Sequence, residues 1–66
     1  MSIGTNIRKI REEKGVKQVE LAEKVGVTQA MICQIERGTK PPSLPLSVDI
    51  AKVLECSIND FIEESY

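Results

Sequence analysis

Side chains able to perform catalysis or to hold a metal ion are scarce in this chain. It has no histidine, and its two cysteines, Cys33 and Cys56, stand far apart without a Cys-x-x-Cys spacing. Neither thiol has a histidine that could activate it as a nucleophile, and no glycine-rich loop suited to a phosphate group is present. These absences predict a protein that is not an enzyme and that uses neither a metal nor another cofactor.

Recognition chemistry, by contrast, is concentrated between residues 28 and 37. A helix that turns Ile32 and Ile35 inward there presents an outer side without an acidic residue. Glutamine can bond adenine through two atoms, the methyl groups of alanine and methionine can meet thymine methyls, and arginine can pair with phosphate or guanine. A side that only faces solvent would more often carry Glu and Lys. The alternative to a DNA-binding surface is an ordinary helical hairpin whose surface is neutral. The outer side consists of Ala30, Cys33, Gln34 and Arg37, with Gln29 at its edge.

A compact all-α domain of five short helices, spanning residues 1–66, is predicted to position that surface. Ile3, Ile7 and Ile10 share one side of the first helix. Thr28 is suited to cap the third helix and Ser57 the last, and a glycine follows each of the first three. The fourth helix offers Val48, Ile50, Ala51 and Leu54 for burial. The helices are expected at about 3–14, 17–25, 28–37, 45–54 and 58–62, and the tail 63–66 is expected to fray.

The second and third of these helices have the features of a steep helical hairpin. Two helices joined by a three- or four-residue turn need a small residue where they touch, and Ala22 is placed for that contact. Gly26 supplies a turn residue that tolerates positive φ. Both helices and the turn then share one core, formed by Leu21, Val25, Val27, Ile32 and Ile35.

The order of these motifs resembles the phage repressor and Cro family of DNA-binding domains, also called Xre-type regulators. In that family an Ile-Arg pair, Arg-x-x-x-Gly, Gln-x-x-Leu-Ala, Gly-Val-[Ser/Thr]-Gln and Ile-Glu-x-Gly follow one another. Here they stand as Ile7-Arg8, Arg11 to Gly15, Gln18 to Ala22, Gly26 to Gln29 and Ile35 to Gly38, continued by Pro42-Ser43, Ile50 to Leu54 and Ser57 to Phe61. The match covers about residues 3–62 without a gap. It implies a lambda-repressor-like fold with a helix-turn-helix over about residues 18–37.

The resemblance also implies which residues meet DNA. Base reading in the family falls on the positions of Gln29, Ala30 and Gln34. Gln18 matches a glutamine that touches phosphate and steadies the first base-reading side chain. Flanking or backbone contacts are expected from Lys17, Gln18, Thr28, Met31, Cys33, Arg37, Thr39 and Lys40.

A structural ion pair is implied as well, because the family pairs an arginine of the first helix with the glutamate that ends the third. Arg11 and Glu36 match these positions. Three residues depart from the family pattern: Lys17 replaces a Ser or Thr cap, Glu55 stands where Gly or Asn often ends a helix, and Cys56 replaces a common Val. We expect Cys56 to be a small core residue, and Cys33 to be a neutral DNA-facing side chain with a redox switch as the alternative.

Charge and composition restrict the binding partners that this chain can have. Residues 1–48 carry eight basic and five acidic side chains, whereas residues 49–66 carry one basic and five acidic ones, so only the first part is suited to a phosphate backbone. No apolar run approaches the roughly 20 residues of a membrane span. Without a signal peptide, the two cysteines indicate reduced thiols in the cytoplasm. A core of this size is modest, so homodimerisation is expected to add stability.

The sequence therefore predicts a nucleoid-associated transcriptional regulator, a repressor that binds double-stranded DNA as a homodimer on an inverted-repeat operator. The dimer surface is expected around Pro42–Leu46 and near Ile58. A protein-interaction module of the same fold, as in antitoxins that bind a small protein partner, is the alternative.

Overall fold

The computed structural model describes residues 3–62, and these form five α-helices without a strand. The predicted all-α fold and the five predicted helices are confirmed, with bounds that differ by one or two residues. Pro45 lies in the first turn of the fourth helix, where its fixed φ and missing N–H are tolerated. The helices are α1 (Ile3–Glu13), α2 (Gln18–Val25), α3 (Gln29–Arg37), α4 (Leu44–Val53) and α5 (Asn59–Ile62). The tail 63–66, predicted to fray, lies outside the described residues.

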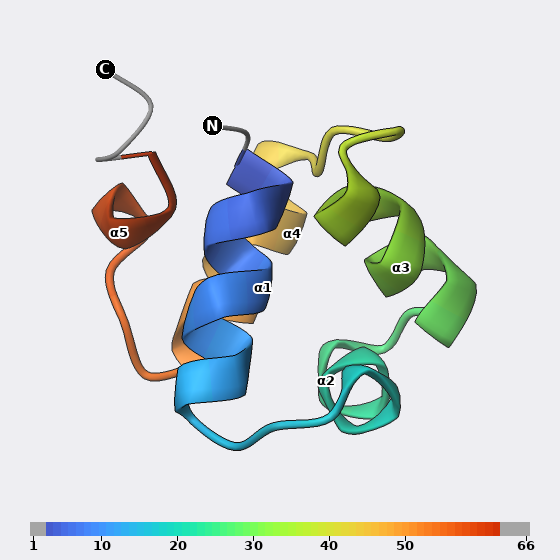
Figure 1. Cartoon of the computed structure of the whole chain (residues 1–66), viewed down its shortest axis with the longest axis horizontal. Coiled ribbons are helices and arrows are strands. Elements are labelled where there is room, and N and C mark those ends of the chain that lie inside the picture. Colours follow the sequence, from blue (N-terminus) through green and yellow to red (C-terminus); the bar gives the residue numbers. More distant parts are fainter. Residues whose placement is uncertain (1–2, 63–66) are drawn as a thin grey trace.

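α1 is the central helix of this arrangement. It contacts α3 on one side and α5 on the other, so that α3 and α5 lie on opposite sides of α1 (Figure 1). α2 contacts both α3 and α4, and α4 lies behind α1 in the same view. The helix that carries the candidate recognition residues is therefore at one end of the molecule, supported from within by α1 and α2.

All five helices contribute to one apolar core, whose largest members are less than 2% exposed. Burial of one such side chain contributes about 1.5–3 kcal/mol. These fully buried residues are Ile7, Leu21, Ile32, Ile35, Ile50, Leu54 and Phe61.

One core assignment on α4 was wrong. Val48, predicted to be available for burial, is 36% exposed, whereas Ser47 is 7% exposed. Ser47, Ile50, Ala51 and Leu54 follow the helical spacing i, i+3, i+4 and i+7, and Val48 lies off that stripe. The Ser47 hydroxyl is accommodated because it donates to the Ser43 carbonyl oxygen at 2.9 Å.

The turn between α2 and α3 has the geometry that its sequence predicts. Gly26 has a φ of 85°, and its N–H donates to the Ala22 carbonyl oxygen at 2.8 Å. The Thr28 hydroxyl then accepts the Met31 N–H at 3.1 Å and caps α3. At the other end of α3, Gly38 has a φ of 82° and its N–H donates to the Ile35 carbonyl oxygen at 3.1 Å. Both ends of α3 are thus fixed by local hydrogen bonds.

Two of the three departures from the family pattern, at Glu55 and at Lys17, have visible structural consequences. Glu55 has a φ of 55°, a left-handed conformation that a residue with a Cβ adopts at a cost. Lys17 provides no side-chain cap for α2, and its N–H instead donates to Glu20 Oε1 at 3.4 Å. Across residues 3–62, no helix is both long and apolar enough to cross a membrane.

Candidate nucleic-acid interface

The outward orientation predicted for one side of α3 is confirmed except at Cys33, which was expected to face outward but is only partly exposed. Gln29, Ala30, Gln34 and Arg37 are exposed, and Met31 and Cys33 are half-buried. Ile32 and Ile35 on the opposite side are at most 1% exposed. The residues that resemble base-reading positions therefore face solvent, because the same helix buries its apolar side against α1 and α2.

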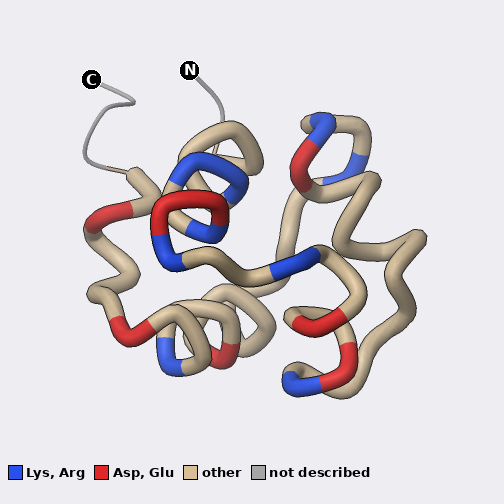
Figure 2. The backbone as a smooth tube through the Cα atoms, turned by 60° about the horizontal axis from the view of Figure 1, so that its bottom comes forward, with Lys and Arg blue, Asp and Glu red and all other residues tan. Residues whose placement is uncertain are grey.

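The polar groups on this surface are available to a ligand. Within the described range 3–62, the side chains of Gln29 and Gln34 make no hydrogen bond, so their amide donors and acceptors face water. α3 contains one acid, Glu36, which is 6% exposed and so contributes no exposed carboxylate. The charged residues of α3 are confined to its last turn, where Glu36 and Arg37 follow one another, and Figure 2 shows how acidic and basic residues are distributed along the described backbone. A polyanion can approach this side without meeting an exposed carboxylate on α3.

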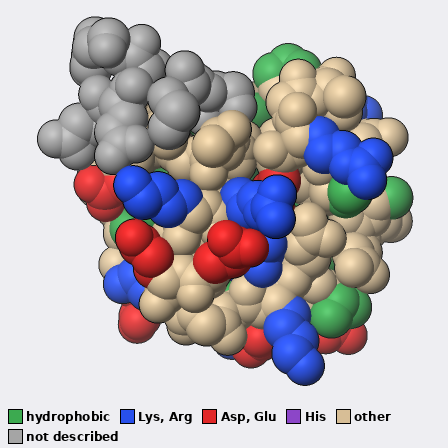
Figure 3. Space-filling model, viewed as in Figure 1, with side chains coloured by type: hydrophobic (Ala, Val, Ile, Leu, Met, Phe, Trp, Pro, Cys, Tyr) green, Lys and Arg blue, Asp and Glu red, His purple; other side chains and the backbone are tan. Residues whose placement is uncertain are grey.

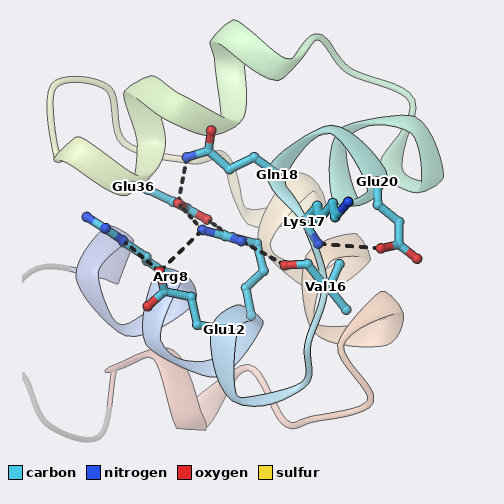
Figure 4. A network of polar contacts seen from close by, with 8 residues as sticks. Arg8, Glu12, Val16, Lys17, Gln18, Glu20 and Glu36 are labelled. Carbon is cyan, nitrogen blue, oxygen red and sulfur yellow. Dashed lines mark hydrogen bonds and ion pairs between the residues drawn. The ribbon is translucent and has the colours of Figure 1, made fainter.

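A buried ion pair holds α3 against α1. Arg11 Nε donates to Glu36 Oε2 at 2.6 Å, and the Arg11 Nη2 donates to Glu36 Oε1 at 3.1 Å. Arg11 is 8% exposed, and its third bond, from Nη1 to the Val16 carbonyl oxygen at 2.7 Å, reaches the connection between α1 and α2. A two-point contact between guanidinium and carboxylate fixes both side chains in orientation. The pair therefore joins α1 and α3, and Arg11 also holds the connection that leads to α2 (Figure 4).

Gln18 belongs to the same network. Its Nε2 donates to Glu36 Oε1 at 2.9 Å, as the dashed line in Figure 4 marks. Glu36 thus accepts from both Arg11 and Gln18, and the half-buried Gln18 side chain is tied to α3 rather than extended from the surface. The N–H groups in the first turn of α2 lack helical acceptors, as at the start of any helix, and these can meet a phosphate.

The candidate backbone contacts flank α3 and begin α2. The N–H groups of Thr39 and Lys40 donate to the Gln34 carbonyl oxygen at 3.1 and 3.4 Å, so both residues lie against the last turn of α3. The Thr39 hydroxyl donates to the same oxygen at 3.0 Å. The structure therefore brings this segment together with the outer side of α3. The exposed members of the set are Lys17, Thr28, Arg37, Thr39 and Lys40.

The exposed face of α1 has a different charge pattern. Arg8 Nε lies 3.4 Å from Glu12 Oε2, and both side chains are more than half exposed. Basic and acidic side chains lie side by side over this face (Figure 3). Because the charges are mixed, this face is a poorer match for a phosphate backbone than the acid-free side of α3.

The two cysteines differ in their surroundings. Both are free thiols that are partly buried, Cys33 on α3 and Cys56 beyond α4. Burial raises the pKa of the Cys56 thiol, the Asp60 carboxylate raises this pKa further, and the Lys14 ammonium lowers it. Among residues 3–62, no cluster of three or more metal-binding side chains occurs. The prediction that Cys56 is a core residue is only partly met, since it packs against the core but is not fully buried.

Two buried residues of α1 were missed by sequence reasoning. Asn6 is 2% exposed, and its Nδ2 donates to the Phe61 carbonyl oxygen at 2.5 Å, which ties α1 to α5. Gly4 is buried against the backbone of α3. The available signal was the spacing of Gly4, Ile7 and Arg11 at i, i+3 and i+7, which places all three on one stripe of the helix.

This geometry is found in known proteins. The HTH_3 family model, described as helix-turn-helix, matches residues 7–61. The chain belongs to the HTH_3 family. The Xre-type family membership and the lambda-repressor-like fold predicted from the motifs are thereby confirmed, and α3 belongs to a DNA-binding helix-turn-helix domain.

Individual relatives agree with this assignment. An uncharacterised HTH-type transcriptional regulator of Archaeoglobus fulgidus is 45% identical over 56 residues, which are 85% of this chain and 80% of that protein. The P22 c2 repressor, in complex with a synthetic operator, superposes with a TM-score of 0.85 at 30% identity, covering 92% of each chain. SinR in its complex with SinI gives a TM-score of 0.87 at 35% identity, covering 97% of this HTH_3 chain but 63% of the other.

Proposed function

We propose that this protein is a sequence-specific transcriptional repressor, and not an enzyme, which inserts α3 into the major groove of double-stranded DNA. The observation that carries the proposal is the exposed, acid-free side of α3, with two glutamines that have no internal partner among the described residues. Free amide groups on a helix held firmly by the protein are what direct reading of base edges requires. Binding to chromosomal DNA places the protein in the cytoplasm, on the nucleoid.

Base reading is assigned to Gln29, Ala30 and Gln34. The two glutamines match the donor and acceptor pair of adenine, and Ala30 offers a methyl group for thymine. Met31 and Cys33, half-buried beside them, add apolar contact at the edge of the groove. This chemistry favours half-sites rich in A·T pairs.

Phosphate binding is assigned to residues at both ends of this surface. Such contacts fix the register of the protein on the duplex without reading its sequence. The side chains of Arg37 and Lys40 supply charge, Thr28 and Thr39 supply hydroxyl groups, and the start of α2 supplies backbone N–H groups. Lys17 lies beside that helix start, and Gln18 contributes through its backbone while its side chain remains bonded to Glu36.

A homodimer on an inverted repeat is the proposed assembly, with two recognition helices about 34 Å apart. The proposed contact is an apolar surface between α4 and α5, where Leu44 is 71% exposed and Ile62 is 37% exposed. A hollow of about 350 Å³ there is lined by Ile3, Pro42, Leu44, Ser47, Ile58, Phe61 and Ile62. This surface includes Pro42 and Leu44 of the segment 42–46, and Ile58, where the dimer contact was expected.

A protein partner on the same apolar surface is the second candidate role. It is favoured by the similarity to SinR, whose structure is that of a complex with the protein SinI. In this alternative the surface between α4 and α5 binds a different small protein instead of a second copy of this chain.

Selection of bound duplexes from a randomised pool tests the DNA-reading role. We expect an enriched inverted repeat, and we expect Gln29→Ala and Gln34→Ala each to lose ~1–3 kcal/mol of discrimination at a different base pair. Lys40→Ala should weaken all sequences alike and reduce the salt dependence by about one released ion. Arg8→Ala, on the mixed-charge face of α1, is the control. Equal losses on selected and random duplexes for all three variants would contradict the assigned roles.

Sedimentation equilibrium tests the assembly. Leu44→Glu places a charge on the proposed contact and should shift a dimer to monomer, with loss of the spacing preference between half-sites. Val19→Glu, at an apolar position of α2 that is 45% exposed, is the matched control for the sedimentation measurement alone, because the start of α2 is assigned to phosphate binding. A wild-type chain that is monomeric, yet captures a second protein through the Leu44 surface, would favour the protein-partner role instead.

A further inference from the structure

α1 meets the recognition helix along a single buried stripe. Gly4, Ile7 and Arg11 follow the spacing i, i+3 and i+7, and all three are buried. Ile7 fills the core in the middle, Arg11 pairs with Glu36, and Gly4 lies against the backbone of Ile35. The stripe therefore holds the last turn of α3 at an ion pair and at a backbone contact.

The backbone contact at Gly4 is too close for any side chain. A Cβ atom at position 4 would lie 1.8 Å from the Ile35 carbonyl oxygen, 2.8 Å from the Ile35 carbonyl carbon and 3.1 Å from the Glu36 Cα. All three neighbours are backbone atoms, which cannot rotate out of the way as the end of a side chain can. Glycine is otherwise disfavoured inside a helix compared with alanine, so the close approach accounts for its presence here.

The residues next to this contact are those proposed to meet DNA. The Ile35 carbonyl oxygen also accepts the Gly38 N–H at 3.1 Å, and the neighbouring Gln34 carbonyl oxygen accepts the N–H of Thr39 at 3.1 Å. A displacement of the Ile35 backbone would therefore move Gln34 and the segment that leads to Lys40. Gln29 lies at the opposite end of α3, beside the Thr28 cap, and is farther from the contact.

We propose that Gly4 is a positioning residue for DNA recognition, an inference that rests on the proposed function. By allowing the backbone of α1 to touch the last turn of α3, Gly4 determines where Gln34 and Lys40 lie relative to Gln29. A side chain at position 4 separates α1 from α3 at this end. It therefore shifts Gln34 and Lys40, whereas Gln29 keeps its place.

The test compares Gly4→Ala with a variant of equal stability that leaves this contact intact. Ile10 packs against the core and lines a hollow with Glu55 and Cys56, without a residue of α3. Whichever of Ile10→Val and Ile10→Ala matches the Tm loss of Gly4→Ala serves as the control. All DNA measurements are made at a temperature at which every variant is folded.

Binding is then measured on the selected operator and on duplexes changed singly at the base pairs that depend on Gln29 or on Gln34. We expect Gly4→Ala to lose about tenfold in discrimination at the Gln34-dependent pair, as for a lost bidentate base contact, and less than threefold at the Gln29-dependent pair. The Ile10 control should keep both. A Gly4→Ala protein that discriminates like the control at both pairs overturns the proposal, as does one that loses both pairs equally.

A spectroscopic measurement separates this inference from the proposed function. The Arg11 Nε proton bonded to Glu36 should give a slowly exchanging NMR signal, because that bond is short and buried. We expect Gly4→Ala to shift this signal and the amide signals of residues 34–40, and to leave those of residues 29–31 nearly unchanged. If the wild-type chain selects no duplex, the proposed function fails while this pattern still tests the placement of α3. A spectrum altered equally along all of α3 would contradict a positioning role.

A Gly4→Ala chain that does not fold is examined again with Glu55→Gly added, which relieves the left-handed φ of 55°. Glu55 lies in the connection between α4 and α5, and the hollows that it lines include no residue of α3. A double variant that folds is measured as above. A double variant that still does not fold shows that the contact serves folding as a whole, and the proposal is then rejected.

Discussion

Residues 3–40 and residues 41–62 of this molecule differ in backbone strain, in buried charge and in exposed apolar surface. In residues 3–40 the left-handed positions are glycines, and the buried charges of Arg11 and Glu36 satisfy one another. In residues 41–62 the left-handed position is Glu55, and the large apolar side chains of Leu44, Val48 and Ile62 are exposed, whereas in residues 3–40 Val19 alone is a large apolar side chain of this kind. The first part is thus built to hold one surface still, whereas the second keeps strain and apolar surface that a partner could cover.

This difference explains why a modest core is sufficient to hold the outer side of α3 in place. α3 needs to be rigid relative to α1 and α2, and a two-point ion pair with two helix caps supplies that rigidity locally. The second part can tolerate a less favourable backbone because, under the proposed function, no base pair is read there. Four comparisons between variants test this contrast.

Arg11→Ala is expected to have the largest effect, a loss of about 3–5 kcal/mol in the free energy of unfolding. It leaves the Glu36 carboxylate, in a residue 6% exposed, without its guanidinium partner. Because a small core supplies about 3–5 kcal/mol in total, the same amount, the variant should be largely unfolded. Urea titration followed by circular dichroism measures this.

Arg8→Ala is the matched control, since Arg8 pairs with Glu12 on the same helix while both are more than half exposed. Its cost should stay below about 1 kcal/mol. Similar losses for the two arginines would mean that the buried ion pair to Glu36 stabilises residues 3–40 no more than an exposed ion pair does.

Thr28→Ala and Ser43→Ala remove equivalent caps from the two parts. The hydroxyl of Thr28 accepts the Met31 N–H at 3.1 Å, and that of Ser43 accepts the Leu46 N–H at 3.2 Å. Each substitution should cost about 1 kcal/mol of stability. Only Thr28→Ala should also weaken DNA binding, because it removes the cap that holds the start of α3 and a hydroxyl group assigned to phosphate. If both variants weaken binding equally in a mobility-shift titration, the functional difference between the two parts is lost.

The helices and the outer side of α3 could be predicted from the sequence because their signals are local. Thr28 marks the start of α3, Gly38 marks its end, and the spacing of Ile32 and Ile35 determines its outer side. The pairing of Arg11 with Glu36 across 25 residues came from the family resemblance and agrees with the observed contact.

Contacts that depend on how helices cross were not predictable in this way. Nothing near Gly4 in the sequence indicates the Ile35 carbonyl, and the bond from Gln18 to Glu36 spans 18 residues. The burial of Ser47 in place of Val48 depends on which side of α4 faces the core, and apolar character alone indicated the wrong residue.

Glu55→Gly should stabilise the chain by about 0.5–1 kcal/mol, since glycine adopts a positive φ without the Cβ penalty. Glu55→Ala is the control, because it removes the same charge but keeps the Cβ atom. We expect a higher urea midpoint for the glycine variant only. Equal midpoints for the two variants would show that charge, and not backbone strain, distinguishes this part of the molecule.

Cys56 gives the smallest expected effect, a loss of stability at alkaline pH that a serine at this position removes. Burial and the Asp60 carboxylate raise the pKa of the folded thiol, so the unfolded chain releases its proton first as the pH rises. The stability associated with the protonated thiol is therefore complete below the ordinary cysteine pKa and declines above it. The urea midpoint of the wild type relative to Cys56→Ser should fall between about pH 7 and pH 10, on either side of the ordinary value near 8.5. A difference that stays constant over this range would place Cys56 in a solvent-like environment, and the second part would then lack this buried ionisable group.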